Sequence, residues 1–566
     1  MVVLRRATTA VLAAALGIAL PLAGSAPAGA GTGSPSTADV GMDVRASTHA
    51  SAGVRIGAGS AVATLPGNTS VRRHPTGTVP ALPLGPAGLT QTATRERLGP
   101  GVRLTTVVRG RASSQDSWVL RSLQPTRAAA DDLAARIRAQ GRPATVQRID
   151  ERAADDPASG PLGWLVVSSG YPTEAAAQGA GAELARSGVT GLGVSNTALY
   201  RTDATGPWVV RILTVDRLKL RQVRAHLATD VVPGRETTSA VAQRLGAVAA
   251  VNGGYFVVGS ADGVPGDLAG VAVQDGRFDS EAVADRAALV VDGRATVIAA
   301  VTTRLRLTSS DGAVETLDGV DRSIGRVRDC GAPGNQPTER PQQDITCTNP
   351  DDIVAFDGAY GQTAEEGPGV AVTLDRRGRV LEVRRERGGA IPAHGRVVEA
   401  IGAGATWLTE HAQVGRTLRV TKVLRAAGRR LVLRHRTGIV NGGPFLVRAG
   451  RVDVDAWHEG FVHPDDPAFY FGFGVSRNPR TMAGLTRRGV LVLVTVDGRA
   501  PGYSIGMSFA EQARVMHALG ARVALNLDGG GSTTMAVRGR LVGRPSDTTG
   551  ERPVGDVVTV LSGSRR

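Results

Sequence analysis

Several residue types are scarce in this chain of 566 residues. Aromatic residues make up 4% of it, and cysteines number two. Beyond the first 20 residues no segment reaches about 18 consecutive apolar residues, which excludes a later membrane-spanning helix. No block of Lys and Arg interleaved with aromatic residues occurs either, so the sequence does not favour binding of nucleic acid.

What the chain does have is length, apolar content and positive charge. Hydrophobic residues make up 42%, enough for real cores, and the length suits two or three domains. The 66 basic residues exceed the 51 acidic ones, so the net charge is +15. Such a charge favours anionic partners such as lipid headgroups or wall polymers.

Residues 1–30 have the order of a secretory signal peptide. Arg5 and Arg6 precede an apolar run over residues 7–20, and small residues with candidate cleavage sites follow. An uncleaved membrane anchor is the alternative, although the apolar run is short for a span. We expect a protein that is secreted, extracellular or associated with the cell wall.

The two cysteines, Cys330 and Cys347, flank a loop rich in Pro, Gly, Gln and Asn. In an exported protein such a pair predicts one disulfide. Closing a loop of this size contributes about 3 kcal/mol if the effect is chain entropy. Neither a CxxC spacing nor a nearby pair of histidines accompanies the cysteines, so the pattern disfavours a metal site there.

Composition divides the rest of the chain into three segments. Residues 31–112 are rich in Gly, Ser, Thr, Pro and Ala, which predicts a low-complexity linker. Residues 113–201 alternate strand-like and helix-like patterns in the order βαββαβ, the ferredoxin-like arrangement. Residues 205–563 contain many short β segments with Asp-Gly and Gly-Arg turns, typical of hairpins. The expected fold class is therefore mixed α+β and α/β, with a small module before a large mixed α/β domain.

The segment 113–201 resembles the SPOR domain, a sporulation-related module. The likeness rests on Trp118-Val119-Leu120, on the stretch from Trp164 to Tyr171, and on the helix that begins after Thr173. It implies binding to the glycan strands of peptidoglycan. An unrelated small α/β module is the alternative, because no sharp motif is involved.

One part of the large domain predicts a strand, a helix and a second strand. An apolar run over residues 490–496 precedes Ser508, which has a glutamate three residues later, as in a capping box. A helix over 509–519 and a strand over 522–527 follow, so we expect a right-handed parallel crossover. It would place Asp528 at the carboxyl end of a strand, where open α/β sheets tend to bind ligands.

Three phrases in the large domain each combine an apolar run, an Asn or Asp, and consecutive glycines. They are Asn252-Gly253-Gly254 with Tyr255, Asn441-Gly442-Gly443, and Asp528-Gly529-Gly530-Gly531 with Ser532 and Thr533. Taken singly, each phrase is typical of a tight turn. Together they predict one site built from several strand ends, in which the amides of the glycine run form an anion-binding nest.

Arg480 and Thr481 precede the strand–helix–strand segment. They suit phosphate, because a guanidinium binds phosphate oxygens bidentately. The alternative is a surface arginine at the junction of a loop and a strand.

With these blocks the chain resembles the phosphodiester glycosidase family over nearly all of residues 205–563. The blocks at Asn252, Asn441, Arg480 and Asn526 occur in the order of the family, the last running through Asp528. Two departures stand out. The family's usual Arg-Thr-Ala-Ile-Gly is Arg-Thr-Met-Ala-Gly at residues 480–484, and the stretch 330–352 looks like a disulfide-closed insertion.

The resemblance implies hydrolysis of a sugar-1-phosphodiester, such as an N-acetylglucosamine-1-phosphodiester, in wall or exopolysaccharide material. Asp528 is the first candidate for the catalytic carboxylate, and Arg480 with the glycine amides is assigned to the phosphate. Asp357 is a second acid candidate, with an ordinary turn aspartate as the alternative. We expect three residues after Asn441 at the rim of the site: His458, Glu459 and His463.

Two further points stay open at this stage. A divalent metal such as calcium is compatible with Asp528 and Asp357 beside carbonyl-rich turns, although neither an EF-hand nor an HExxH pattern occurs. The alternative function is a non-catalytic protein that binds peptidoglycan or an anionic polysaccharide.

Overall fold

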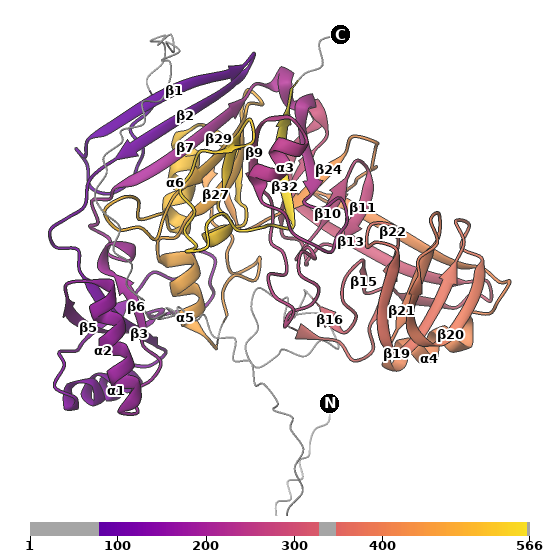
Figure 1. Cartoon of the computed structure of the whole chain (residues 1–566), viewed down its shortest axis with the longest axis horizontal. Helices are drawn as coiled ribbons and strands as arrows, with labels where there is room; N and C mark the ends of the chain where they lie inside the picture. Colours follow the sequence, from indigo (N-terminus) through magenta and orange to yellow (C-terminus); the bar gives the residue numbers. More distant parts are fainter. Residues whose placement is uncertain (1–78, 328–346, 464, 563–566) are drawn as a thin grey trace, which may run out of the picture. The chain divides into compact units, whose positions relative to one another are not determined.

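The computed structural model describes residues 79–327, 347–463 and 465–562 and is rich in strands with few helices (Figure 1). This agrees with a β-rich mixed fold. The predicted signal peptide 1–30, most of the predicted linker and Cys330 lie outside the described residues. Cys347 is buried in the short strand β17 (Cys347–Thr348), and its pairing with Cys330 stays a prediction.

An eight-stranded sheet has the order β1-β2-β7-β28-β27-β29-β25-β26 and carries Arg480 and the strand before Asp528. Its strands are β1 (Gln91–Gly99), β2 (Val102–Arg109), β7 (Trp208–Val215), β28 (Leu491–Val496), β27 (Arg480–Thr486), β29 (Ala521–Asn526), β25 (Phe445–Arg448) and β26 (Arg451–Val452). β28 is buried along its whole length and β27 along all but its last residue, because side chains cover both faces of the sheet there.

The prediction of a linker over 31–112 is wrong for its last part, because β1 and β2 form a hairpin at one edge of this sheet. β2 pairs with β7 along its whole length, from Val102 opposite Val215 to Arg109 opposite Trp208. Leu104 and Val107 point into the cores. The few apolar residues lie among many Thr, Arg and Gly residues, so the sequence shows no clear strand pattern here. Pairing with β7 stabilises the hairpin.

The segment between β2 and β7 is an insertion into the main domain. Where the segment leaves and rejoins the sheet, the Arg111 amide donates to the Thr205 carbonyl at 2.9 Å, and the Thr205 hydroxyl donates to the Arg111 carbonyl at 2.8 Å. The large domain therefore begins before residue 113 and resumes near residue 205. The predicted boundaries placed the segment in front of that domain instead.

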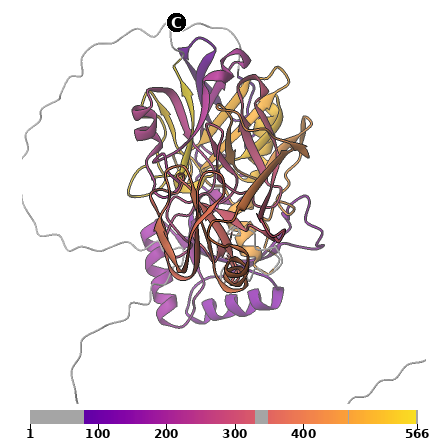
Figure 2. The same ribbon diagram turned by 90° about the vertical axis from the view of Figure 1, so that its right-hand side faces the viewer.

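The inserted segment has the predicted element order βαββαβ. Its strands pair antiparallel in the order β4-β5-β3-β6. Thr126 and Thr173 cap the two helices, as side-chain oxygens do at helix starts. The elements are β3 (Trp118–Gln124), α1 (Arg127–Ala139), β4 (Thr145–Ile149), β5 (Gly163–Tyr171), α2 (Glu174–Arg186) and β6 (Gly193–Asn196). The two helices are the purple ones at the lower edge of Figure 2.

Both faces of this four-stranded sheet are covered. On one face, Leu120 and Val166 pack with the helices. On the other face, Leu123 and Leu165 belong to the same core as residues of the main domain. Arg477 of the main domain also donates to the carbonyls of Ala198 and Arg201, at 2.9 and 2.7 Å. The module therefore shares a core with the main domain, and most of both sheet faces is covered apart from the edge strand β4.

Three further sheets of five or more strands belong to the described residues. One has the order β11-β10-β24-β12-β13-β22-β23 with β14 beside β13, a second β31-β30-β9-β32-β8, and a third β15-β18-β21-β19-β20. Their strands are β8 (Val223–Leu227), β9 (Ala247–Asn252), β10 (Ala272–Gln274), β11 (Arg277–Ser280), β12 (Ala287–Val291), β13 (Val297–Ser309), β14 (Val314–Thr316), β15 (Gly319–Val320), β18 (Ile353–Phe356), β19 (Thr363–Leu374), β20 (Val380–Ala390), β21 (Arg396–Ala400), β22 (Leu418–Ala426), β23 (Arg429–Arg430), β24 (Gly438–Asn441), β30 (Met535–Val537), β31 (Arg540–Leu541) and β32 (Asp556–Leu561).

The helices of the main domain are short, and a two-stranded sheet joins β17 to β16. The remaining elements are β16 (Arg326–Val327), α3 (Thr238–Arg244), α4 (Gly402–His411), α5 (Pro467–Tyr470) and α6 (Phe509–Ala518). No helix among the described residues is long and apolar enough to cross a membrane.

The predicted strand–helix–strand segment is present as β28, α6 and β29. Ser508 and Glu511 form the capping box at the start of α6. β28 and β29 are each antiparallel to β27, which lies between them, so the two strands run parallel as expected. Asp528 thus follows the carboxyl end of β29, and β27 brings Arg480 and Thr481 to the same end of the sheet.

Candidate active site

Three strand ends from three different sheets meet at Tyr255. Each of β9, β24 and β29 ends at an asparagine: Asn252, Asn441 and Asn526. The Tyr255 amide donates to Asn441 Oδ1 at 2.8 Å, and its hydroxyl donates to the Gly443 carbonyl at 2.7 Å. Asn526 Nδ2 donates to the Tyr255 hydroxyl at 2.7 Å. The predicted convergence of the glycine phrases is therefore present as one buried hydrogen-bond network.

Asn252 fixes the segment that carries Asp528. Its Nδ2 donates to the Asp528 carbonyl at 2.8 Å. Its Oδ1 accepts from the Thr481 hydroxyl at 2.6 Å and from the Thr534 amide at 3.1 Å. Thr481 is fully buried. Because its hydroxyl is already used on Asn252, Thr481 positions the site from behind and does not present a donor to a substrate.

Gly253 and Gly254 contact two aspartates, one through its backbone amide and the other through its carboxyl group. The Asp528 amide donates to the Gly253 carbonyl at 3.1 Å, and the Gly254 amide donates to Asp556 Oδ1 at 2.8 Å. A Cβ on Gly253 would lie 2.3 Å from Asp556 Oδ1, so only glycine fits there. Asp556, the first residue of β32, was missed in the sequence. The signal available was its place at the start of the last apolar run of the chain, after Arg552-Pro553-Val554.

Burial shifts the pKa of both carboxyl groups. Burial raises the pKa of Asp528 to about 6, against the opposing effects of the Ser532 hydroxyl, the Gly529 amide, Arg552 and Arg480. Burial, assisted by the charge of Asp528, raises the pKa of Asp556 to about 7. Asp528 nevertheless keeps partial access to solvent. Two carboxyl groups that titrate near neutrality are suited to acid and base roles.

The predicted nest of glycine amides is wrong for most of its members. Residues Gly530–Ser532 form one turn of 3-10 helix, and most backbone amides in and beside this turn already have acceptors. The Gly529 amide donates to Asp528 Oδ1, and the Gly530 amide donates to the Pro479 carbonyl. The amides of Ser532 and Thr533 donate to carbonyls within the turn. These amides are therefore not free for a phosphate, and the glycines serve close packing.

Arg480 is placed differently from its predicted role as a phosphate ligand. It is 1% exposed; its Nε donates to the Met507 carbonyl at 2.9 Å, and its Nη2 donates to the Phe473 carbonyl. Its guanidinium lies 4.7 Å from the ring centroid of Phe509. Burial lowers its pKa to about 10. Arg480 acts on the site through its charge, which favours the ionised form of Asp528.

Two other arginines lie at the glycine turn. Arg499 is exposed, and its Nη2 donates to Asn478 Oδ1 at 3.0 Å; among the described residues no carboxylate lies within ion-pair distance of it. A Cβ on Gly530 would lie 3.2 Å from this Nη2. Arg552 pairs with Asp547 at 2.8 Å, and a Cβ on Gly531 would lie 2.2 Å from its Nη2. Arg499 was missed because Asp497-Gly498-Arg499 was interpreted only as a hairpin turn.

Asp357, the second predicted acid, belongs to a separate group. Its Oδ1 accepts from the Ala359 amide at 3.0 Å, its amide donates to Asp321 Oδ1 at 2.9 Å, and its Oδ2 lies 3.5 Å from Lys422 Nζ. It makes no hydrogen bond to the network around Tyr255. The alternative interpretation as a turn aspartate describes these contacts.

Glu459 is also not at the rim, where the sequence placed it. It is buried, and its carboxylate accepts from the amides of Ala287 and Phe445, at 2.8 and 2.6 Å. Burial raises its pKa to about 8. Glu459 therefore ties β12 to β25 behind the glycine phrase at Gly443. For calcium, no group of three or more His, Cys, Asp or Glu residues suited to a metal occurs within the part of the chain that the structure describes.

Comparisons with known proteins concern the family of the chain. The phosphodiester glycosidase family model matches residues 369–561, which include Arg480, Asp528 and Asp556. No curated protein sequence matches the chain. A Burkholderia pseudomallei K96243 protein named for inferred export is 33% identical, with a TM-score of 0.76, over 85% of this chain and 98% of its own.

Two more distant structures are also similar. A hypothetical protein from Synechocystis is 17% identical, with a TM-score of 0.48, over 83% of this chain and 79% of its own. The catalytic domain of zebrafish N-acetylglucosamine-1-phosphodiester alpha-N-acetylglucosaminidase is 16% identical, with a TM-score of 0.31, over 63% of this chain and 78% of its own. On the identity and coverage of the Burkholderia protein, the chain belongs to the same family as that protein, and it carries a phosphodiester glycosidase domain at residues 369–561.

Proposed function

We propose that this chain is an exported glycosidase that hydrolyses sugar-1-phosphodiesters in cell-wall or exopolysaccharide material. The observation that carries the proposal is the pair Asp528 and Asp556, both bonded to the Gly253-Gly254 turn, with Arg499 beside the adjoining glycines. The family match over residues 369–561 supports the reaction class.

The reaction breaks the bond between the anomeric carbon and the bridging oxygen. The phosphomonoester leaves with the electron pair, and its charge is stabilised by the guanidinium of Arg499. Water supplies the hydroxyl that bonds to the anomeric carbon, and its proton passes to the Asp528 carboxylate. Because a phosphomonoester is already a good leaving group, the main needs are charge stabilisation at the oxocarbenium-like centre and a carboxylate base.

The two carboxyl groups take different parts in this scheme. With a pKa of about 6, Asp528 is mostly ionised at neutral pH and serves as the base. Asp556, with a pKa of about 7, carries a proton in about half of the molecules at that pH and takes up or returns protons beside it. Asn252 and Thr481 are positioning residues, since their side chains bond the Asp528 segment and each other.

The cellular setting is also part of the proposal. Residues 1–30 have the pattern of a secretory signal, and the Burkholderia relative is named for export. We assign the inserted SPOR-like module to peptidoglycan, which it would contact through its helices, loops and edge strands because its sheet faces are covered. The chain should sediment with purified peptidoglycan, and Arg127→Gln with Trp164→Ala should reduce the sedimented fraction. If the chain stays in the supernatant, the assignment of the module to peptidoglycan is wrong.

Turnover by the full chain tests the central proposal. We expect release of N-acetylglucosamine and a phosphomonoester from an α-N-acetylglucosamine-1-phosphodiester, and loss of that release in Asp528→Asn. The amide retains an oxygen that accepts from Gly529, so the fold is preserved. Binding of the substrate without turnover would instead favour a non-catalytic polysaccharide-binding protein.

A further inference from the structure

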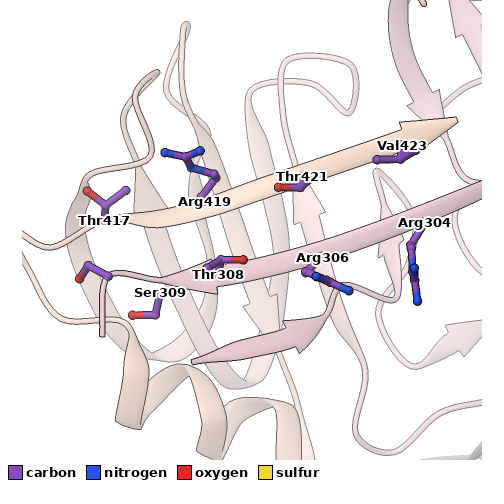
Figure 3. Close-up of a pocket in the computed structure, with 9 residues that line it drawn as sticks. Arg304, Arg306, Thr308, Ser309, Thr417, Arg419, Thr421 and Val423 are labelled. Carbon is purple, nitrogen blue, oxygen red and sulfur yellow. The ribbon is translucent and has the colours of Figure 1, made fainter. Parts of the chain in front are cut away.

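One face of the paired strands β13 and β22 forms a basic trough far along the chain from Asp528. The trough has a volume of about 680 Å³ and is lined by side chains of both strands and their ends (Figure 3). Arg304, Arg306 and Arg419 provide its charge, and Thr308, Thr417 and Thr421 provide hydroxyl groups. We name this surface the arginine ribbon.

The register of the two strands explains the ribbon. Arg304 lies opposite Val423, Arg306 opposite Thr421, and Thr308 opposite Arg419. Since side chains alternate between the two faces of a strand, these residues share the outer face. The residues between them, Leu305 and Leu307 among others, are buried in the core below. The inner face of the strand pair packs on the core and so holds the two strands in position. The outer face is polar along most of its length.

The three arginines of the ribbon differ from those exposed arginines of the chain that form ion pairs. Arg127, Arg136 and Arg244, for example, each pair with an aspartate. Within the described ranges, no carboxylate lies at ion-pair distance from Arg304, Arg306 or Arg419, and all three are exposed. Like charges that gather on one face of a strand pair repel one another, and an anion bound between them relieves this repulsion. The ribbon is thus arranged to receive negative charge.

The spacing of the arginines and the chemistry of the other lining side chains restrict the class of ligand that the ribbon can bind. Alternate residues of a strand lie about 6.6 Å apart, so Arg304 and Arg306 can each contact a separate anionic group of one extended chain. The threonine hydroxyls between the guanidiniums suit sugar hydroxyls. No aromatic side chain lines the trough, so stacking of nucleic-acid bases has no platform there.

We propose that the arginine ribbon binds an extended glycan whose repeating units are joined by phosphodiesters. The choice of this polymer rests on the proposed function, because a hydrolase of sugar-1-phosphodiesters meets them in chains. Binding along the ribbon would retain the polymer between cleavage events. The ribbon would then affect the affinity for polymers and leave a substrate with one phosphodiester unaffected.

The test measures binding directly in the full chain carrying Asp528→Asn, which prevents cleavage. The probe is fluorescently labelled poly(N-acetylglucosamine-1-phosphate). The test variant adds Arg304→Gln, Arg306→Gln and Arg419→Gln. The control makes the same change in net charge with Arg103→Gln, Arg451→Gln and Arg540→Gln, three exposed strand residues outside the ribbon.

We expect the ribbon variant to bind the polymer about 10- to 100-fold more weakly, and the slope of log K against log salt to fall by about 2 to 3. The control should change affinity less than about threefold. With Asp528 restored, KM for the polymer should rise in the ribbon variant, and KM for a single phosphodiester glycoside should not.

Three outcomes would overturn the inference. Equal weakening by the two triple variants would show that only net charge matters. Equal or tighter binding of single-stranded DNA of the same charge would show a general polyanion surface. If the full chain does not bind the polymer, the proposed ligand is wrong. Ribbon-specific binding without hydrolysis by the unmutated chain would retain this inference and reject the proposed function.

Discussion

Two strand ends of this protein carry the same phrase, an apolar strand followed by Asp-Gly, and they differ in what surrounds the carboxylate. Asp528 follows β29 and Asp357 follows β18. The Asp357 carboxylate accepts from the Ala359 amide and lies 3.5 Å from Lys422. Both residues are half-buried, but Asp528 lies in the field of Arg480, Arg499 and Arg552.

The difference shows what converts a turn aspartate into a candidate catalytic group. Asp357 caps its own turn, as Asx residues commonly do. Asp528 is held from behind by Asn252, which bonds the Asp528 carbonyl and leaves the side chain at the surface of the site. A second carboxyl group, Asp556, lies on the other side of the same glycine pair. The local phrase is shared, but the framework of asparagines and arginines is not.

The largest expected effect separates the two aspartates directly. Asp528→Asn removes the base and should lower kcat/KM by about 10³- to 10⁴-fold on an N-acetylglucosamine-1-phosphodiester. Asp357→Asn keeps the turn and should leave kcat/KM within about threefold, because the group lies outside the site. Steady-state kinetics on the two purified variants checks both values. Similar losses in both variants would contradict the distinction.

Asp556→Asn should have the next largest effect and a separate signature in stability. Loss of its proton exchange should lower kcat/KM about 10²-fold. Burial raises its pKa to about 7, above the value of about 3.9 for an unfolded aspartate. Between pH 4 and 7 the folded chain therefore binds a proton that the unfolded chain does not, so this group's contribution to the free energy of unfolding falls as pH rises.

The amide in Asp556→Asn cannot ionise, so the variant avoids this loss. Its free energy of unfolding should exceed that of the unmutated chain by about 1–3 kcal/mol at pH 8 and match it near pH 4. Denaturant unfolding at the two pH values provides the measurement. Asp357→Asn, handled in parallel, is the control for a general effect of replacing an aspartate. A variant less stable than the unmutated chain at pH 8 would mean that the Asp556 charge is compensated.

The sequence predicted the ends of strands better than the partners of side chains. The glycine phrases at Asn252, Asn441 and Asp528 could be grouped because short local patterns mark strand ends. Asp556 and Arg499 could not, because their roles depend on contacts between segments far apart in the chain, such as Gly254 with Asp556. The hairpin of β1 and β2 was missed for the same reason, since pairing with β7 stabilises it.

Replacing the cation beside each aspartate should also affect kcat/KM differently. Arg499→Gln removes the guanidinium assigned to the leaving phosphate and should lower kcat/KM about 10- to 100-fold, the value of a charge-assisted hydrogen bond in a transition state. Lys422→Gln removes the cation beside Asp357 and should leave kcat/KM unchanged. The same kinetic assay applies. If Arg499→Gln has no effect, the phosphate is bound elsewhere in the site.

The smallest effect tests the framework behind Asp528. Thr481→Val keeps the shape of the side chain but removes the 2.6 Å hydrogen bond to Asn252 Oδ1. We expect the free energy of unfolding to fall by about 1–2 kcal/mol, since a buried acceptor loses one of its donors. Thr495 lies opposite Thr481 in the register, is equally buried, and its hydroxyl has no hydrogen-bond partner among the described residues. Thr495→Val should therefore leave stability unchanged or raise it slightly, and equal losses in the two variants would attribute the effect to packing in β27 and β28 rather than to the support of Asp528.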